Sequence, residues 1–331
     1  MLYIYYKMIN IGINGFGRIG KLLSRLVLSD SRLRLCSVNH PTLTKSDYNY
    51  LLKYDSVHGT YPIQPSNTSV NIHNCREPKD IVWEDEIDII FDTTGKFKTK
   101  ETLMAHKENT NLDEDTVVLL TAPPKDDTPM FVYGVNHINY NNETVISAAS
   151  CTTTCLAPIA KILNDNYGIV NGLATTIHSA TASQYTVDKY TSGKRTGRCV
   201  MNNIIPSTTG AAKAIGKVIP ELNGKLDAVS VRVPVSNVSL LDLNVNLEKS
   251  PEIDEVLSLI KTLSQSDQYF NIVDVNNDLV VSSDFIGNRK NAIVDGLSAM
   301  KMDDMYKFLI WYDNEYGYAE NIIRFIKYLK F

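Results

Sequence analysis

One cysteine in this sequence has surroundings that favour chemistry. Cys151 follows an apolar run that ends near Ala148, and a helix is expected to begin near Thr152. A helix N-terminus favours the thiolate form of cysteine, which is the reactive nucleophile. Cys155 lies one turn further along and is expected to be buried. We therefore interpret Cys151 as the candidate nucleophile, although its local sequence alone leaves a structural cysteine open.

A thiol nucleophile needs a base, and His178 is the best placed of the six histidines. The segment 175–178 ends an apolar strand and is followed by a polar stretch, residues 179–183. A histidine at the end of a strand can point into a cleft and accept a proton. The same pattern also fits a surface histidine without a catalytic role.

A glycine motif lies near the start of the chain, from Gly15 to Gly20, with the pattern G-x-G-x-x-G. A strand is expected before it, over 9–13, and a helix is expected over 19–28. Glycines at this spacing allow a tight turn and a close approach of backbone to pyrophosphate, and the helix N-terminus attracts the phosphates. The motif in this context predicts dinucleotide binding.

The second expected strand does not end in the acid that usually binds the ribose of NAD. It ends at Asn39, followed by His40 and Pro41. Without a carboxylate nothing repels a 2′-phosphate, so both NAD and NADP are compatible with this position. Alternatively, Asn39 and backbone groups hold the ribose. Three polar residues just beyond the strand could meet a phosphate: Thr42, Thr44 and Lys45.

The elements that must position these residues differ between the two halves of the chain. The first half alternates strands and helices, which predicts a Rossmann-type parallel sheet domain over 1–150. The second half has long alternating runs, which predict an α+β domain with a largely antiparallel sheet over 151–314. The expected strands are 9–13, 33–38, 87–91, 117–120, 144–146, 226–232, 238–247 and 309–312, and the later helices are 251–263 and 319–329.

Composition excludes several classes of protein. The 331 residues are 44% hydrophobic and 21% charged, which suits two globular domains of ordinary size. The formal net charge of −4 favours neither nucleic acid nor an anionic membrane as a partner. Five cysteines without a repeating framework favour a reducing compartment, and the C-x3-C spacing from Cys151 is not a zinc pattern, so no metal is expected. Residues 1–8 are expected to form a short extension, and the absence of a long apolar run favours the cytoplasm.

The motifs together resemble the signatures of the glyceraldehyde-3-phosphate dehydrogenase family. The resemblance covers nearly the whole chain, in order and with familiar spacing. It rests on six segments: 13–20, 150–158, 203–214, 222–226, 231–234 and 311–318.

This resemblance implies the phosphorylating oxidation of glyceraldehyde 3-phosphate to 1,3-bisphosphoglycerate, in glycolysis or gluconeogenesis. Cys151 matches the residue that attacks the aldehyde and then carries a thioester, and His178 matches its base. Thr181 and Arg232 match the residues that bind the substrate phosphate. The residues that match the site for inorganic phosphate are Ser150, Thr152, Arg198, Thr209 and Gly210.

The resemblance also implies cofactor contacts along most of the chain. Arg76 matches the residue beside the adenine, and Asn314 matches the residue that bonds the nicotinamide amide, with Tyr318 nearby. The C-terminal helix, residues 315–331, is expected to return to the cofactor domain. The remaining cofactor residues are Asn14, Gly15, Phe16, Gly17, Arg18, Ile19, Asn39, His40, Thr94, Gly95 and Thr121.

Family members are usually homotetramers, in which a loop, here about residues 180–203, lines a neighbour's cofactor site. Three segments depart from the family pattern: His40 replaces Asp, Lys189-Tyr190 replaces Gly-Pro, and Thr154 replaces Asn. The first two weaken an assignment to NAD alone. Two alternatives remain: an erythrose-4-phosphate dehydrogenase, which hydrolyses its thioester, and a non-catalytic protein that retains dinucleotide binding.

Overall fold

The computed structural model describes residues 8–63, 69–108 and 110–330. The expected N-terminal extension, apart from Met8, therefore lies outside the described residues. The chain divides into two compact units. The first contains Met1–Tyr133, His137–Ala149 and Ile322–Phe331, and the second contains Gly134–Asn136 and Ser150–Asn321.

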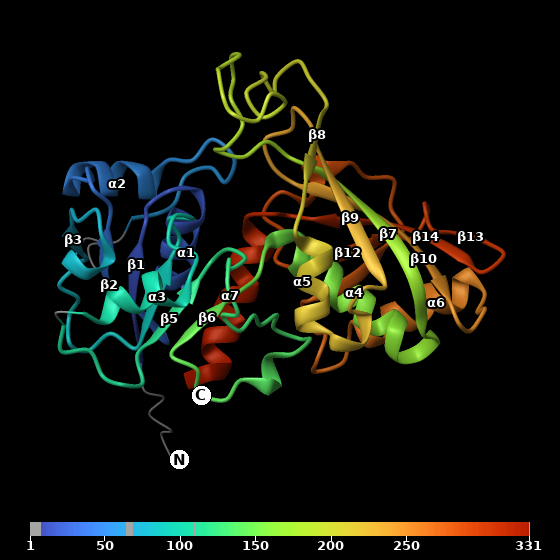
Figure 1. Cartoon of the computed structure of the whole chain (residues 1–331), viewed down its shortest axis with the longest axis horizontal. Helices are drawn as coiled ribbons and strands as arrows, with labels where there is room; N and C mark the ends of the chain where they lie inside the picture. The colour runs from blue at the N-terminus through green and yellow to red at the C-terminus, as the bar shows by residue number, and fades with distance from the viewer. Residues whose placement is uncertain (1–7, 64–68, 109, 331) are drawn as a thin grey trace. The chain divides into compact units, whose positions relative to one another are not determined.

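The first unit is built on a six-stranded sheet in the order β3-β2-β1-β4-β5-β6 (Figure 1). Every neighbouring pair is parallel. The order reverses direction between β1 and β4, which is the point where parallel α/β sheets bind their ligands. The strands are β1 (Ile9–Asn14), β2 (Leu33–Asn39), β3 (Asn71–His73), β4 (Ile89–Asp92), β5 (Val117–Leu120) and β6 (Val145–Ser147).

Helices cover this sheet with apolar faces. In α1, Leu22, Leu23 and Val27 repeat at helical spacing and are buried. The last turns of the C-terminal helix belong to the same unit, where Phe325 packs against Phe131 with ring centroids 5.4 Å apart. The helices are α1 (Arg18–Leu28), α2 (Lys45–Lys53), α3 (Lys100–Met104) and α7 (Tyr316–Lys330), with short 3-10 turns η2 (Pro78–Asp80), η3 (Ala105–Lys107) and η4 (His137–Asn139).

The second unit is built on an eight-stranded mixed sheet in the order β11-β12-β14-β10-β7-β9-β8, with β13 paired to β14. Only β7 with β9 and β11 with β12 run parallel. In β10, residues of alternating burial give one covered face. The strands are β7 (Ile169–His178), β8 (Ile205–Thr208), β9 (Leu226–Arg232), β10 (Ser239–Leu247), β11 (Val273–Asn276), β12 (Ala292–Asp295), β13 (Met300–Met302) and β14 (Met305–Tyr312).

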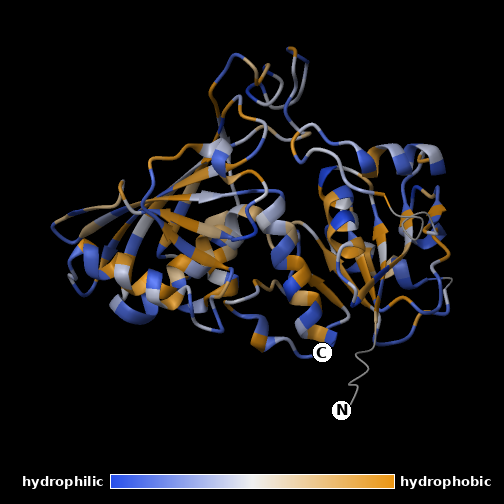
Figure 2. Ribbon diagram, turned by 180° about the vertical axis from the view of Figure 1, so that it is seen from behind, coloured by the Kyte–Doolittle hydropathy of each residue, from blue (hydrophilic) through white to orange (hydrophobic). Residues whose placement is uncertain are grey.

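Helix α4 is the central helix of the second unit, and it packs against α5 and against β10. Figure 2 shows apolar residues concentrated on the strands and on one side of the helices. The helices are α4 (Cys151–Tyr167), α5 (Ala211–Val218) and α6 (Ile253–Leu263), with short 3-10 turns η5 (Pro220–Leu222) and η6 (Ser282–Phe285).

The predicted fold class is confirmed: a Rossmann-type parallel sheet and a largely antiparallel second sheet are both present. Sequence periodicity missed several short elements, among them β3, β8 and β13, because three or four residues carry too little pattern. It also placed the start of β4 at residue 87, two residues before Ile89. Within the described residues, the helices are too short or too polar to cross a membrane.

Candidate active site

Cys151 is the first residue of α4, which begins one residue before the start near Thr152 that the sequence predicts. Ser150 caps this helix, since its hydroxyl accepts a hydrogen bond from the Thr153 N–H at 3.1 Å. The hydroxyl of Thr154 donates to the Cys151 carbonyl at 2.9 Å, so the threonine at this position still bonds the first turn. Cys155 is fully buried one turn further on. The helix thus presents one cysteine at its tip and packs the other.

His178 faces Cys151 from the end of β7. The two atoms involved, Cys151 Sγ and His178 Nε2, are 3.4 Å apart. Strand β7 pairs in parallel with β9, and the register places Arg232 directly beside His178. Thus two residues that the sequence separates by 54 positions meet at the ends of adjacent strands.

Arg232 determines which nitrogen of His178 carries the proton in this arrangement. Its Nη1 is 2.7 Å from His178 Nδ1 and 3.2 Å from the Ser179 carbonyl. A guanidinium group only donates hydrogen bonds, so Nδ1 must be the acceptor and the ring proton lies on Nε2, toward sulfur. The Ser179 carbonyl is itself 2.9 Å from Nδ1 and can accept from it once Arg232 moves away.

The electrostatics of this pair correct one expectation. Burial raises the pKa of the Cys151 thiol, although the charge of Arg232 acts in the opposite direction. Burial, assisted by Arg232, lowers the pKa of His178 to about 4. We expected the helix terminus to favour a thiolate, but the loss of water around the thiol outweighs that contribution. The resting pair is therefore a neutral thiol beside a neutral imidazole.

A buried tyrosine supports the pair from behind. The hydroxyl of Tyr312 lies 3.1 Å from Thr152 Oγ1 and 2.7 Å from Thr176 Oγ1, and its ring packs edge-on against His178. The Thr152 hydroxyl is thus directed into the core, and its backbone N–H bonds the sulfur of Cys151. Sequence reasoning missed Tyr312, because nothing in β14 signals its contact with α4.

Asn314 has a fixed orientation. Its Oδ1 accepts hydrogen bonds from Ser179 Oγ and Ser239 Oγ, each at 2.8 Å. With the carbonyl end held by two donors, the amide NH2 is the end that can donate to a ligand. Asn314 and Tyr318 are both buried, and both belong to the second unit. Ser239 is a further residue that the sequence did not single out.

The other residues expected at phosphate sites lie mainly in exposed segments. Thr181 Oγ1 bonds Gln184 Oε1 at 2.9 Å, and Arg198 forms an exposed ion pair with Asp188 at 2.9 Å. Thr209 Oγ1 accepts from the Ala211 N–H at the start of α5, where Gly210 is the N-cap residue. Among the described residues, no hydrogen bond or ion pair joins Thr181 or Arg198 to Cys151.

The first unit contains a pocket of about 400 Å³ at the carboxyl ends of its central strands. Seven of the expected cofactor residues line it: Asn14, Gly15, Phe16, Gly17, His40, Arg76 and Thr94. Six lining residues were not in that set: Pro41, Thr42, Cys75, Thr93, Lys96 and Phe97. None of the lining residues carries a carboxylate.

The glycines of the motif fit a dinucleotide for different reasons. Gly15 has φ +101°, which a residue with a Cβ rarely adopts. A Cβ on Gly20 would lie 2.1 Å from the Gly15 carbonyl oxygen, so this glycine allows helix and turn to touch. A Cβ on Gly17 would meet nothing within 4 Å, which leaves open space at the uncapped start of α1. The positive end of a helix beside open space suits a pyrophosphate.

Other expected cofactor residues bond within the protein. Asn39 is buried, and its amide bonds Asn14 and the backbone of Cys75. Arg18 forms an ion pair with Asp55 at 2.5 Å. The hydroxyl of Thr121 donates to the Asp92 carbonyl at 3.1 Å. Ile19, Gly95 and Thr121 do not line the pocket.

Of the three polar residues after β2, only Thr42 lines the pocket. Thr44 instead caps α2 through its contact with Asp47. Lys45 donates to the Val70 carbonyl. Among the polar residues just after β2, His40 and Thr42 are therefore the ones that line the pocket.

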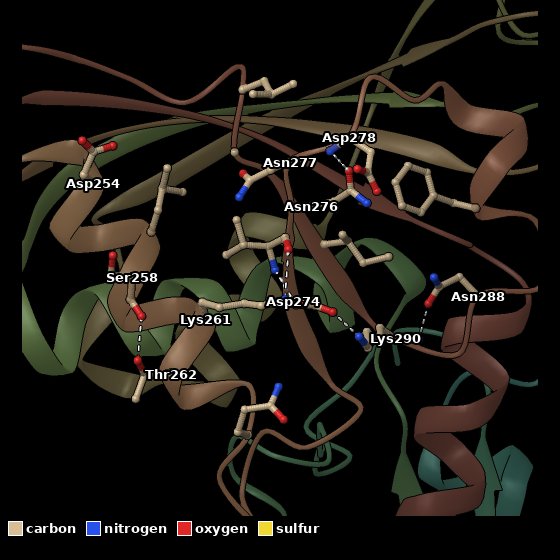
Figure 3. A pocket seen from close by; sticks show the side chains of 17 residues that line it. Asp254, Ser258, Lys261, Thr262, Asp274, Asn276, Asn277, Asp278, Asn288 and Lys290 are labelled. Atoms are coloured by element: carbon tan, nitrogen blue, oxygen red, sulfur yellow. Dashed lines mark hydrogen bonds and ion pairs between the residues drawn. The ribbon is translucent and has the colours of Figure 1, made fainter.

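A second cavity, of about 1190 Å³, lies beside α6 and β11 (Figure 3). Its lysines, Lys261 and Lys290, both form ion pairs with Asp274. The residues lining it include no cysteine and no histidine. Among the described residues, no cluster of three His, Cys, Asp or Glu side chains is arranged to hold a metal ion.

The fold and the site define a nicotinamide-dependent oxidoreductase. Residues 9–100 match the model of the glyceraldehyde 3-phosphate dehydrogenase NAD binding domain, and residues 150–314 match that of the C-terminal domain. The chain belongs to the glyceraldehyde-3-phosphate dehydrogenase family. It is 44% identical over 335 residues to a cytosolic glyceraldehyde-3-phosphate dehydrogenase of Sinapis alba, covering 97% of both chains.

Two further relatives come from a yeast and a nematode. The chain is 42% identical over 335 residues to glyceraldehyde-3-phosphate dehydrogenase 1 of Kluyveromyces lactis, covering 97% of this chain and all of the relative. It is 41% identical over 340 residues to glyceraldehyde-3-phosphate dehydrogenase 1 of Caenorhabditis elegans, covering 97% and 98%. The similarity therefore extends through both units.

Proposed function

We propose that the chain catalyses the phosphorylating oxidation of glyceraldehyde 3-phosphate to 1,3-bisphosphoglycerate, as a step of glycolysis or gluconeogenesis. The observation that carries this proposal is the 3.4 Å approach of Cys151 Sγ to His178 Nε2 at the start of α4. The first unit binds the dinucleotide and the second carries the catalytic pair. The family of the chain supports the substrate assignment.

In the proposed reaction Cys151 is the nucleophile and His178 is the base. The sulfur adds to the aldehyde carbon, its proton passes to His178 Nε2, and that proton neutralises the new oxygen as a hemithioacetal forms. A bound nicotinamide supplies the acceptor for the hydride that the substrate carbon loses. His178 removes the hydroxyl proton as the thioester forms. A phosphate oxygen then attacks the thioester carbon, the carbon–sulfur bond breaks, and the proton held by His178 returns to sulfur.

Arg232 controls when His178 can act as a base. In the resting arrangement the ring proton lies on Nε2, because Arg232 donates to Nδ1. The Nε of Arg232 is buried and has no hydrogen-bond partner within the described residues. A substrate phosphate satisfies this donor and draws the guanidinium from Nδ1. Nδ1 then donates to the Ser179 carbonyl, and Nε2 becomes free to accept the thiol proton.

The attacking phosphate binds at a second anion site. We assign it to the start of α4, with Ser150 and Thr152, and to the start of α5, with Thr209 and Gly210. The Ala211 N–H at the start of α5 already donates to Thr209 Oγ1, and the positive end of this helix attracts an anion. Thr181 and Arg198 complete the two phosphate sites in this proposal, Thr181 the substrate phosphate and Arg198 the attacking phosphate.

The cofactor is a nicotinamide dinucleotide, and we propose that both NAD and NADP are used. The pocket lined by Asn14 and Gly15 contains His40, Arg76 and Lys96 but no carboxylate. His40 Nδ1 accepts from the Thr42 N–H at 3.4 Å, so the ring N–H is on Nε2. A 2′-phosphate thus meets donors and no repelling charge.

We further propose that the protein is a cytoplasmic homotetramer. Apolar side chains on the sheet of the second unit are exposed, with Leu173 on β7 at 67% and Val229 on β9 at 54%. A second copy covering this face would remove that surface from water. The five cysteines are all unpaired, which suits a reducing compartment. Sedimentation of the purified protein tests the tetramer.

The test of the proposed function is an assay of dinucleotide reduction with purified protein. Glyceraldehyde 3-phosphate should be oxidised with NAD, and turnover should depend on inorganic phosphate. Erythrose 4-phosphate with rapid turnover in the absence of phosphate would favour the alternative dehydrogenase. Binding of NAD without turnover of either aldehyde would favour a non-catalytic protein.

A further inference from the structure

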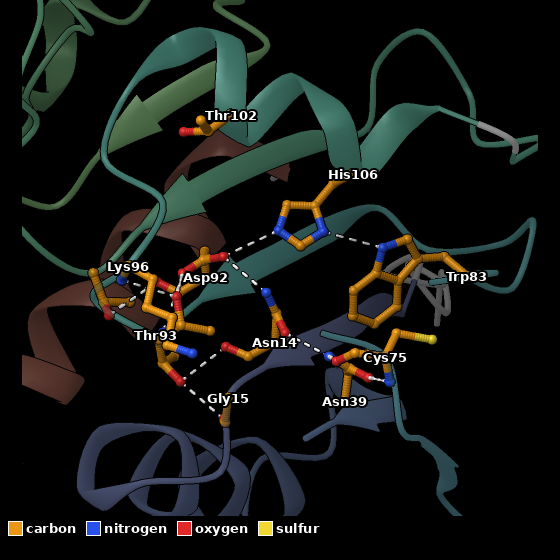
Figure 4. Close-up of polar contacts among 12 residues, drawn as sticks. Asn14, Gly15, Asn39, Cys75, Trp83, Asp92, Thr93, Lys96, Thr102 and His106 are labelled. Carbon is orange, nitrogen blue, oxygen red and sulfur yellow. Dashed lines mark hydrogen bonds and ion pairs between the residues drawn. The ribbon is translucent and has the colours of Figure 1, made fainter. Parts of the chain in front are cut away.

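A buried polar network lies behind the dinucleotide pocket, and no step of the proposed reaction uses it (Figure 4). Its core is Trp83, His106 and Asp92, all in the first unit. His106 and Asp92 have no exposed surface, and Trp83 is 2% exposed. Polar groups buried this deeply are retained only when their hydrogen bonds are satisfied. The directions of those bonds show what the network holds in place.

The indole of Trp83 fixes the tautomer of His106. Trp83 Nε1 lies 3.3 Å from His106 Nδ1. An indole N–H can only donate, so Nδ1 is the acceptor and the ring proton lies on Nε2. His106 Nε2 is 3.1 Å from Asp92 Oδ2, and it therefore donates to the carboxylate.

Asp92 accepts from four donors and donates to none. Its Oδ2 also accepts from Asn14 Nδ2 at 2.9 Å, and its Oδ1 accepts from the Thr94 N–H and hydroxyl at 3.1 and 2.7 Å. Only an acceptor-only group fits this set of partners. An asparagine at this position would direct an NH2 group at one of the donors.

The network continues to the walls of the pocket. Asn14 Oδ1 accepts from Asn39 Nδ2 at 2.7 Å, and Asn39 in turn bonds the backbone N–H and carbonyl of Cys75 at 2.9 and 3.1 Å. Asn14, Asn39 and Asp92 are the last residues of β1, β2 and β4. One connected set of bonds thus joins the strand ends around the pocket that Asn14, Cys75 and Thr94 line.

We propose that Trp83 and His106 are positioning residues for the dinucleotide, acting through Asp92. Neither lines the pocket, so their effect on the ligand is indirect. By holding Asp92 in an acceptor-only role, they keep Asn14 and the Thr94 turn in the geometry that receives the cofactor. A pocket that is already ordered loses less entropy on binding. This inference rests on the dinucleotide site of the proposed function but not on its aldehyde chemistry.

The test compares two substitutions of His106 in the full-length protein. His106→Gln retains an acceptor for Trp83 and a donor for Asp92, whereas His106→Leu removes both. Calorimetric titration with NAD should show about tenfold weaker binding for His106→Leu, the scale of one lost bond to a charged group. His106→Gln should stay within about threefold of the parent. With NAD saturating, turnover of glyceraldehyde 3-phosphate should change less than about twofold, because the polar network affects dinucleotide binding and not the chemical step.

A matched control separates positioning from general destabilisation. Val118 is fully buried in the same apolar cluster as Trp83 but takes no part in the polar network. Val118→Ala should lower the free energy of unfolding without weakening NAD binding. Equal affinity in the parent and His106→Leu, or equal loss of affinity in His106→Leu and Val118→Ala, would overturn the proposal. Parent protein that binds NAD but oxidises no aldehyde would overturn the proposed function alone.

A measurement on the unmodified protein addresses the case in which a variant does not fold. Nitrogen-15 spectra of histidine-labelled protein report the tautomer of each of the six histidines. The His106 resonance, assigned from its loss in His106→Gln, should show a proton on Nε2. A proton on Nδ1 would mean that Trp83 does not donate to the His106 ring, and the proposed network would be wrong.

A double variant tests the same network. In Asp92→Asn, NAD binding should weaken. Adding Trp83→Phe should partly restore it, because the His106 ring can then change tautomer and accept from the new amide.

Discussion

The Nη1 atom of Arg232 lies 2.7 Å from Nδ1 of His178, so a cation is in direct contact with the ring that must act as a base. The contact disfavours a second proton on His178, and burial acts in the same direction, which together lower the pKa of this residue to about 4. The same guanidinium opposes the effect of burial on the Cys151 thiol. One arginine therefore adjusts both members of the pair.

Arg232→Gln should raise the pKa of His178, because the neutral side chain no longer disfavours the imidazolium. It should also raise the pKa of Cys151, because the thiolate loses its nearby positive charge. Alkylation of Cys151 at neutral pH should then slow, about tenfold for each unit by which the thiol pKa rises. The alkylation rate measured against pH gives the thiol pKa, and a profile unchanged from the parent would contradict this role for Arg232.

Cys151→Ser should abolish oxidation of glyceraldehyde 3-phosphate while leaving NAD binding intact, because a serine hydroxyl is a far weaker nucleophile near neutral pH. Cys155→Ala is the matched control, since Cys155 is fully buried in the same helix. It should retain most of the turnover at a modest cost in stability. Near-normal oxidation by the Cys151 variant would show that another residue is the nucleophile.

The stability of the protein should fall in mild acid because of His178. Its pKa is about 4 in the folded protein, against about 6.5 in the unfolded chain. Between these values the unfolded chain binds more protons, so the contribution is complete above pH 6.5 and is lost as the pH falls toward 4. The expected loss is about 2 kcal/mol between pH 7 and pH 5. Urea unfolding of the parent and of His178→Asn checks this: the variant should lose correspondingly less, and equal losses would contradict it.

Two glycines of the dinucleotide motif should respond differently to alanine. A Cβ at Gly20 would lie 2.1 Å from the Gly15 carbonyl oxygen, so Gly20→Ala should destabilise the first unit. A Cβ at Gly17 meets nothing within 4 Å, so Gly17→Ala should fold normally. It should lose NAD affinity, because the added methyl group occupies the space in which the pyrophosphate is expected to bind. Thermal unfolding and NAD titration of both variants provide the comparison. Unchanged NAD binding in Gly17→Ala would place the pyrophosphate elsewhere.

His40→Asp should lower the use of NADP and keep or improve the use of NAD. The introduced carboxylate would repel a 2′-phosphate and accept a hydrogen bond from a 2′-hydroxyl. The quantity to measure is kcat/KM with each dinucleotide. If the parent already excludes NADP by about a thousandfold, or about 4 kcal/mol, another residue sets the preference.

Local spacing in the sequence determined the parts of this protein that depend on near neighbours. The strand before Gly15 and the helix that begins at Arg18 are adjacent in the chain, so their pattern predicts a dinucleotide turn without further information. The start of α4 next to Cys151 follows from the same kind of signal, an apolar run that ends near Ala148 just before a helical run. The alternation in β10 likewise predicts a strand with one covered face.

Tertiary structure decided what depends on distant partners. The register of β7 against β9 brings Arg232 to His178. Tyr312 at the end of β14 contacts Thr152 of α4, although the two residues are 160 positions apart in the sequence. Burial then reverses the local expectation for Cys151, because the helix terminus is a nearest-neighbour effect while desolvation is set by everything packed around the thiol. Asn39 shows the same division: its place at a strand end is local, but its bonds to Asn14 and Cys75 come from neighbouring strands.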